Sequence, residues 1–129
     1  MVDSCLELWR IAVDTEFSAA HIIPGHPKCG RMHGHNYKVE VSLTGDKLNQ
    51  NGFLIDFGDV KSSLNTIVGL LDHTYLNDSI PKEYQPPSAE NIAFYVYSSL
   101  SERLPPNLGV IVRVWETPHQ WAEYQTAKV

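Results

Sequence analysis

The chain has few cysteines, no long apolar run and no excess of positive charge. Its 129 residues include only Cys5 and Cys29, which are too few for a disulfide framework. The amino terminus shows no basic segment followed by an apolar core, and apolar stretches such as 67–71 are too short to cross a bilayer. A net charge of −5 argues against a nucleic-acid binder. We therefore expect a cytoplasmic protein without membrane or nucleic-acid partners.

The remaining composition is that of a globular protein. Hydrophobic residues make up 43% of the chain and charged residues 19%, which lies far from the composition of disordered proteins. The length suits a single domain, residues 1–129, with a core of ordinary size. An anionic small substrate stays compatible with the acidic balance, because Lys28, Arg31 and Lys38 supply local positive charge.

Two segments alternate between apolar and polar residues, as half-buried strands do. From Trp9 to Phe17 the apolar side chains fall on odd positions, and from Tyr37 to Leu43 they do so again. Extending the second strand backwards places His33 and His35 on its apolar face. His21 shares the apolar parity of the first strand if no bulge intervenes. Both strands are therefore predicted to direct histidines inward.

Two segments show the spacing of helices with one buried face. Asp56 is a plausible N-cap for a helix whose apolar stripe runs through 57–71. A proline-rich loop, 80–87, leads to Ser88, which can cap a second helix with a stripe through 93–104. Prolines at 105–106 end that helix.

The carboxy-terminal part reads as two further strands. Residues 109–115 are short, β-branched and mostly apolar, and 121–128 can pair with them across a turn at Thr117-Pro118. The resulting order ββααββ predicts an α+β fold, with a four-stranded antiparallel sheet carrying both helices on one face. Such a sheet leaves unpaired edges, which favours oligomerisation.

His21, His33 and His35 together suggest a zinc site that is open for chemistry. Catalytic zinc sites use three protein ligands and keep one position for water or substrate, whereas structural sites close with cysteine. Cys29, separated from His33 by three residues, has two interpretations. As a fourth ligand it makes the site structural, and as an uncoordinated thiolate it can act as a base or nucleophile.

Three acidic or basic positions elsewhere have both a structural and a catalytic interpretation. Asp72 and His73 follow the first helical stripe, where they can cap the helix or form an acid/base relay. Adjacent residues on a regular element point apart, so the relay requires an irregular turn. Glu116 ends an apolar strand face; it either reaches solvent or accepts paired N–H donors from a planar ligand such as an aminopyrimidinone.

Taken together, these motifs resemble the 6-pyruvoyl-tetrahydropterin synthase and 6-carboxytetrahydropterin synthase family. The matching pieces follow the family's order along nearly the whole chain. They are Phe17-Ser18-Ala19-Ala20-His21, Cys29-Gly30-Arg31-Met32-His33-Gly34-His35-Asn36-Tyr37, Gly52-Phe53-Leu54-Ile55-Asp56-Phe57-Gly58-Asp59, Leu71-Asp72-His73, Pro87-Ser88-Ala89-Glu90-Asn91 and Trp115-Glu116-Thr117. The short gap between Cys29 and His33 looks like the carboxy branch.

The resemblance implies the tunnelling fold, assembled as a homohexamer with active sites at subunit interfaces. It also implies roles for individual residues. These are Zn²⁺ on His21, His33 and His35, the proton-accepting thiol on Cys29, the relay on Asp72 and His73, the pterin anchor on Glu116, and substrate contacts at Ser88 and Glu90. Ser88 stands where the family often has threonine, and it keeps the hydroxyl.

The implied reaction is zinc-dependent conversion of 7,8-dihydroneopterin triphosphate to 6-carboxy-5,6,7,8-tetrahydropterin. Triphosphate and acetaldehyde are lost, and the product leads toward queuosine and other 7-deazaguanines. The nearest alternative is 6-pyruvoyl-tetrahydropterin synthase activity, which eliminates triphosphate without cleaving a carbon–carbon bond. A non-catalytic zinc module that uses Cys29 as its fourth ligand is an alternative from another class.

Overall fold

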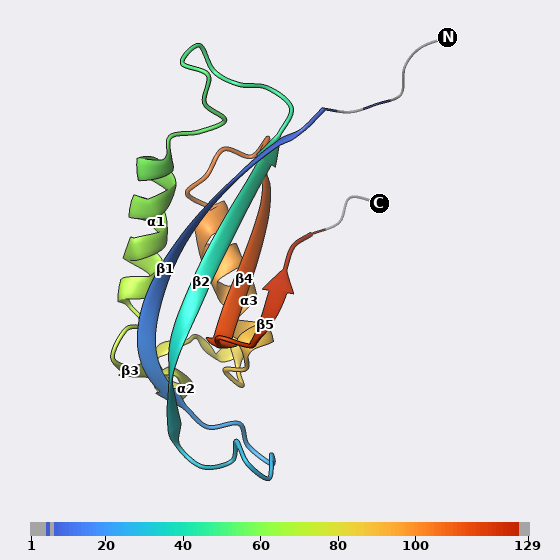
Figure 1. Ribbon diagram of the computed structural model, residues 1–129. Coiled ribbons are helices and arrows are strands. Elements are labelled where there is room, and N and C mark those ends of the chain that lie inside the picture. Colours follow the sequence, from blue (N-terminus) through green and yellow to red (C-terminus); the bar gives the residue numbers. More distant parts are fainter. Residues whose placement is uncertain (1–4, 6, 127–129) are drawn as a thin grey trace.

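The computed structural model describes Cys5 and residues 7–126, which fold into one mixed sheet with helices on one face (Figure 1). The elements follow in the order β1 (Trp9–His21), β2 (His33–Gly45), α1 (Phe57–Gly69), β3 (Thr74–Tyr75), α2 (Leu76–Ser79), a 3-10 turn η1 (Lys82–Tyr84), α3 (Ala89–Ser101), β4 (Gly109–Thr117) and β5 (Gln120–Tyr124). Within the described part of the chain, no helix is long and apolar enough to cross a membrane.

The strands lie in the spatial order β3-β1-β2-β4-β5. The four long strands pair antiparallel, as predicted, whereas β3 pairs parallel with β1 through Ala19 and Ala20. The prediction of four strands was therefore one short. A two-residue strand has no periodicity to detect, and its pairing depends on where the chain returns after α1.

The predicted helix caps are confirmed. The Asp56 carboxylate accepts a hydrogen bond from the Gly58 N–H at 2.7 Å, and the Ser88 hydroxyl accepts one from the Asn91 N–H at 3.1 Å. Each cap satisfies an N–H group that has no partner within its helix. The proline-rich loop between the helices, predicted to be irregular, contains η1.

The core lies between the sheet and the helices α1 and α3. α1 packs against β1, and α3 packs against β4 and β5, all on one side of the sheet. The buried apolar residues alternate along the strands and recur at helical spacing, as the pattern predicted. The largest fully buried side chains are Tyr37, Leu43, Leu64, Leu71, Leu76, Ile92 and Leu100.

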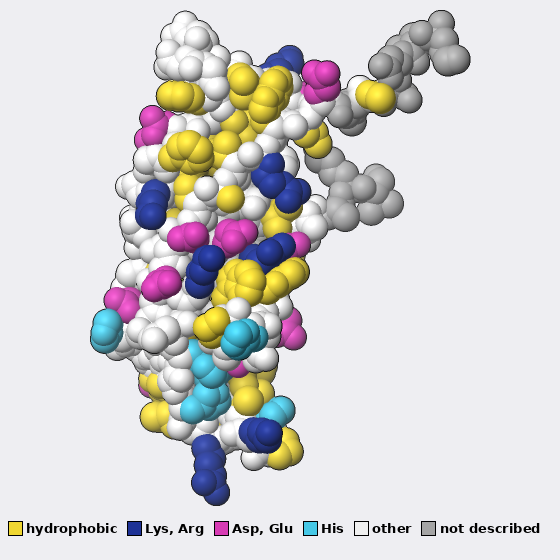
Figure 2. Space-filling view, in the orientation of Figure 1, with side chains coloured by type: hydrophobic (Ala, Val, Ile, Leu, Met, Phe, Trp, Pro, Cys, Tyr) yellow, Lys and Arg dark blue, Asp and Glu magenta, His cyan; other side chains and the backbone are white. Residues whose placement is uncertain are grey.

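The opposite sheet face carries charged and aromatic side chains. Acidic and basic residues form a band across the middle of the view in Figure 2, and histidine side chains are visible in its lower part, at one end of the sheet. Arg113 stacks over Trp121 with 3.8 Å between the guanidinium carbon and the ring centroid, and it bonds the Glu123 carboxylate at 2.9 Å.

The β1–β2 ladder is longer than the β2–β4 ladder, and this difference leaves one end of β2 without a partner on the β4 side. β1 and β2 pair without interruption from Trp9 opposite Gly45 to His21 opposite His33. The β2–β4 ladder reaches only as far as Lys38. The end of β2 that carries the histidines therefore extends past β4, and a hollow opens between β2 and the β4–β5 turn.

Candidate active site

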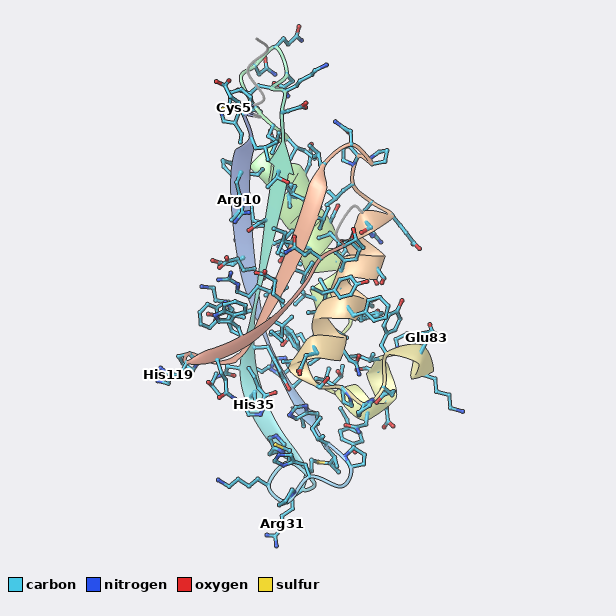
Figure 3. The ribbon with its side chains drawn as sticks, turned by 90° about the vertical axis from the view of Figure 1, so that its right-hand side faces the viewer. Cys5, Arg10, Arg31, His35, Glu83 and His119 are labelled. Carbon is cyan, nitrogen blue, oxygen red and sulfur yellow. The ribbon has the colours of Figure 1, made fainter. Side chains whose placement is uncertain are left out.

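The strand register brings His21, His33 and His35 together at one end of the sheet. One ring nitrogen from each residue lies within 4.8 Å of the others. His21 is fully buried, and the other two are half-buried. The uninterrupted β1–β2 pairing keeps all three on the helix-bearing face, as their parity predicted. In the side view, His35 lies between the loop that carries Arg31 and the turn that carries His119 (Figure 3).

The hydrogen bonds of two rings fix which nitrogens can bind a cation. His21 Nδ1 lies 2.8 Å from the Pro87 carbonyl oxygen, and His33 Nδ1 lies 2.7 Å from the Arg31 carbonyl oxygen. A carbonyl only accepts, so each Nδ1 carries the proton and donates it. An imidazole whose one ring proton is on Nδ1 presents a lone pair at Nε2, and the Nε2 atoms of His21 and His33 lie 2.8 Å apart. Two facing lone pairs are stabilised by a cation between them.

His35 completes the donor set. Its Nε2 is buried and has no hydrogen-bond partner among the described residues, and the Glu116 carboxylate is 3.5 Å away. Burial lowers the pKa of His35; Glu116 opposes this effect, and the neighbouring His21 and His33 add to it. Three neutral imidazoles suit zinc, which takes nitrogen ligands and prefers deprotonated donors. The residues present therefore fit the metal.

Tyr37 contacts the histidine cluster from the core. Its ring is fully buried and stacks on Phe17 with 4.8 Å between centroids, and its hydroxyl lies 3.2 Å from His21 Nδ1. Burial raises the pKa of Tyr37 above its usual value, and the charges of Glu116 and Cys29 add to the increase. The phenol therefore stays protonated. Tyr37 was expected only as a core residue, although its parity with His33 and His35 already placed it beside the site.

Cys29 lies in the turn between β1 and β2. It is half-buried and forms no disulfide. The cluster of potential metal ligands among the described residues consists of the three histidines and does not include this thiol. Its negative form contributes to the pKa of Tyr37, so the sulfur is within electrostatic range of the site. This arrangement supports the interpretation of Cys29 as an uncoordinated thiol.

Asp72 and His73 meet through an irregular turn, which is what a relay between adjacent residues requires. His73 has a φ of 58°, in the left-handed region, and its Nδ1 lies 3.0 Å from the Asp72 carboxylate. Asp72 also accepts the Ser18 N–H at 2.9 Å, and this bond is the main reason that the pKa of Asp72 is lowered. The His73 side chain is 82% exposed and lines a hollow that His35 also lines.

Glu116 faces a cavity of about 630 Å³ in the hollow beside β2. The pairing of β4 with β5 is irregular between Trp115 and Thr117, and such irregularities redirect side chains. His35, Lys38 and Trp115 line the same cavity. The Trp115 indole N–H is buried without a hydrogen-bond partner in the described part of the chain, so it is a donor that the sequence did not single out.

Two further predicted substrate contacts, Ser88 and Glu90, lie at the amino-terminal end of α3. Glu90 is exposed and, with Glu116, lines a smaller cavity of about 290 Å³. Ser88 is half-buried, and its hydroxyl oxygen already accepts the Asn91 N–H of the helix cap. Glu90 therefore shares a cavity with the pterin-anchor candidate, whereas the contact shown for Ser88 is structural.

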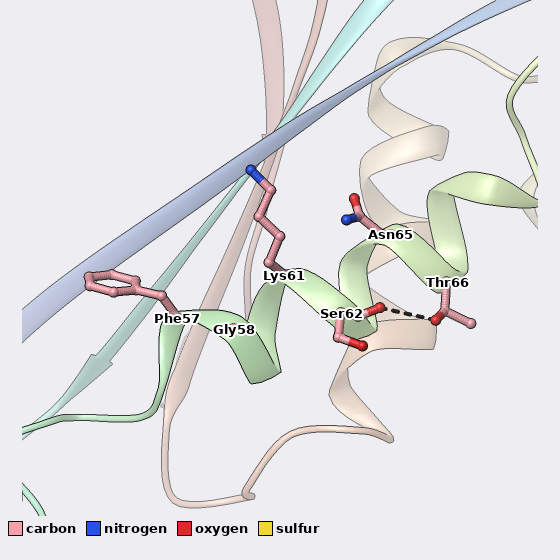
Figure 4. Close-up of a pocket in the computed structure, with 6 residues that line it drawn as sticks. All are labelled: Phe57, Gly58, Lys61, Ser62, Asn65 and Thr66. Atoms are coloured by element: carbon pink, nitrogen blue, oxygen red, sulfur yellow. Dashed lines mark hydrogen bonds between the residues drawn. The ribbon is translucent and has the colours of Figure 1, made fainter.

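A hollow of about 760 Å³ lies away from these residues. It is an open groove along the outer side of α1, lined by Phe57, Lys61, Ser62, Asn65 and Thr66 (Figure 4). Its only ionisable lining group is Lys61, and none of the predicted site residues takes part in it. The histidine end of the sheet remains the candidate site, because chemistry requires convergent polar groups rather than volume.

This fold and this cluster define the class of protein. The chain belongs to the 6-pyruvoyl tetrahydropterin synthase family, whose model matches residues 10–127. It is 47% identical to the putative 6-carboxy-5,6,7,8-tetrahydropterin synthase of Archaeoglobus fulgidus over 114 residues, which cover 88% of this chain and 92% of that relative. It is 37% identical to the 6-carboxy-5,6,7,8-tetrahydropterin synthase of Synechocystis sp., over 91% of this chain and 93% of the relative.

The fold is also that of a solved family structure. The chain superimposes on 6-pyruvoyl tetrahydropterin synthase from Caenorhabditis elegans with a TM-score of 0.83, covering 95% of this chain and 98% of that one. The sequence identity between the two is 24%. The predicted tunnelling fold is therefore confirmed, with the additional short strand β3.

Proposed function

We propose that this chain is a zinc-dependent lyase that converts 7,8-dihydroneopterin triphosphate to 6-carboxy-5,6,7,8-tetrahydropterin, releasing triphosphate and acetaldehyde. The observation that carries the proposal is the three-histidine cluster. The Nε2 atoms of two of its rings lie 2.8 Å apart, and the third ring has a buried nitrogen without a hydrogen-bond partner among the described residues. The names of two relatives, at 47% and 37% identity, support the carboxy product.

Each site residue has a task that suits its surroundings. His21, His33 and His35 hold zinc, which supplies Lewis acidity toward the oxygens of the substrate side chain. Cys29 accepts a proton from the carbon beside those oxygens.

His73, which lines a hollow together with His35, returns protons to the substrate while Asp72 orients its ring. Glu116 accepts N–H donors of the pterin ring and so aligns the reacting carbons. Glu90, across the smaller cavity, contributes a second carboxylate, and Ser88 shapes the helix end beside it.

The site is completed by neighbouring subunits in a cytoplasmic homohexamer. Two features of the single chain support this part of the proposal. The end of β2 that carries His33 and His35 has no β4 partner, and the His73 ring is mostly exposed. In cells the product feeds the synthesis of queuosine and related 7-deazaguanines.

Product analysis tests the proposal. Purified protein loaded with zinc and incubated with dihydroneopterin triphosphate should release triphosphate and acetaldehyde in equal amounts. Triphosphate without acetaldehyde assigns the pyruvoyl reaction instead, and release of neither product refutes a synthase.

Cys29→Ala tests the role of the thiol. The variant should keep its zinc but lose turnover by about 10²-fold or more, the usual contribution of a positioned proton acceptor. Zinc content is measured by metal analysis beside the wild type. Loss of the metal in the variant would make Cys29 a ligand and favour the non-catalytic module.

A further inference from the structure

The turn that carries Cys29 is organised by a histidine outside the metal cluster. His26 is exposed and takes no part in the cluster of potential metal ligands. Its ring nitrogen Nδ1 nevertheless accepts two backbone hydrogen bonds, from the N–H of Lys28 at 3.1 Å and from the N–H of Cys29 at 2.9 Å. The side chain of an exposed histidine often makes no contact with the rest of the chain, whereas this ring is hydrogen-bonded to the backbone of Cys29.

The direction of these bonds defines what His26 contributes. Both donors are amides, so Nδ1 carries a lone pair and the ring proton lies on Nε2. A side-chain acceptor that bonds the N–H groups two and three residues ahead is the arrangement used by asparagine, aspartate and serine in turns and helix caps. His26 therefore acts through a single acceptor atom, and an asparagine oxygen can replace that atom.

Two backbone hydrogen bonds also stabilise this turn. The Ile23 N–H donates to the Cys29 carbonyl at 2.6 Å, and the Gly30 N–H donates to the His26 carbonyl at 2.9 Å. A side chain at Gly30 would bring its Cβ to 2.6 Å from that same carbonyl oxygen. Both backbone polar groups of Cys29 are thus held, and only glycine fits after it.

We propose that His26 is a positioning residue that holds the Cys29 thiol over the three-histidine site. The proposal rests on the proposed function, because it assigns His26 a catalytic effect only if Cys29 accepts a proton from the substrate. Its structural part is independent of that reaction, since the imidazole fixes the Cys29 amide whatever the thiol does. The turn follows directly after β1, so fixing it ties Cys29 to the strand that ends at His21.

Three variants test the proposal in the full-length, zinc-loaded protein. His26→Ala removes the acceptor, His26→Asn restores one, and His119→Ala removes an exposed histidine from the β4–β5 turn as a control. Amide hydrogen exchange of Lys28 and Cys29 is followed by NMR. Steady-state kinetics with dihydroneopterin triphosphate, zinc content and the thermal midpoint are measured in parallel.

His26→Ala should speed exchange of both amides and lower kcat by about tenfold, the effect of losing two ordinary hydrogen bonds. KM and zinc content should stay close to wild type, and the thermal midpoint should fall by at most about 5 °C. His26→Asn should recover slow exchange and most of kcat, and His119→Ala should match wild type.

Two results would overturn the inference. One is unchanged exchange and kcat in His26→Ala, and the other is a His26→Asn variant as impaired as His26→Ala. If the wild-type protein has no synthase activity, the proposed function fails, while the exchange rates still decide whether His26 holds the turn.

Discussion

Zinc should stabilise this protein through the three-histidine cluster, and the size of the effect can be worked out beforehand. His21 and His33 direct Nε2 lone pairs at each other across 2.8 Å, and the buried Nε2 of His35 has no hydrogen-bond partner within residues 7–126. All three histidine nitrogens gain a bonding partner when zinc binds the folded chain. An unfolded chain does not hold them together, so binding favours the folded state.

A ligand at 100 times its Kd stabilises the folded state by about 2.7 kcal/mol. With an unfolding entropy of roughly 2.1 cal/mol/K per residue, a chain of 129 residues should gain about 10 °C in its thermal midpoint. His33→Ala removes one of the three donors. If the affinity falls a hundredfold, the same free zinc should raise the midpoint by only about 1.5 °C.

The assay is thermal unfolding of metal-stripped protein in zinc buffers of fixed free concentration. The Kd of the wild type is taken from a competition titration. His119→Ala serves as the control, because this histidine lies outside the cluster, and it should show the full zinc effect. The reasoning is refuted if zinc leaves the wild-type midpoint unchanged, or if His33→Ala responds as strongly as the wild type.

Two further predictions concern the carboxylates. Asp72→Ala should be less stable than wild type at pH 7, and the difference should shrink as the pH falls below the ordinary carboxyl value of 3.8, because the lowered pKa of Asp72 contributes stability only while the carboxylate is ionised. Denaturant unfolding at several pH values measures this, and a difference independent of pH would contradict it. Glu116→Gln should lower kcat/KM about 10- to 100-fold, the effect of losing a charged acceptor, with zinc content unchanged. Steady-state kinetics decide the matter, and a loss below twofold would remove Glu116 from the site.

Strand parity and cap residues predicted most of the fold. The apolar alternation in β1 and β2 fixed which face holds the core, and Asp56 and Ser88 marked the helix starts correctly. The fifth strand, β3, was missed because two residues are too few to show a period. The predicted last strand, 121–128, begins one residue earlier and ends at Tyr124; its final positions, 127–128, lie outside the described residues.

The site was predictable where it depended on parity and not where it depended on turns. His21, His33 and His35 converge because an uninterrupted register keeps them on one face. The left-handed conformation of His73 and the use of His26 as a backbone acceptor arise from loop geometry, which has no period in the sequence. The position of Tyr37 beside the site followed from its parity, but its role was not predicted, because a buried aromatic residue in a strand is usually a core residue.

Because the β2–β4 ladder ends at Lys38, much of the buried core lies apart from the end of β2 that carries the candidate site. The fully buried side chains Leu64 and Leu100 belong to α1 and α3, and Leu43 lies on the part of β2 that pairs with β4, away from the overhang that carries the histidines. Substrate preference can therefore evolve on that overhang at little expense to global stability. Local opening there should occur at a lower free energy than unfolding of the whole chain.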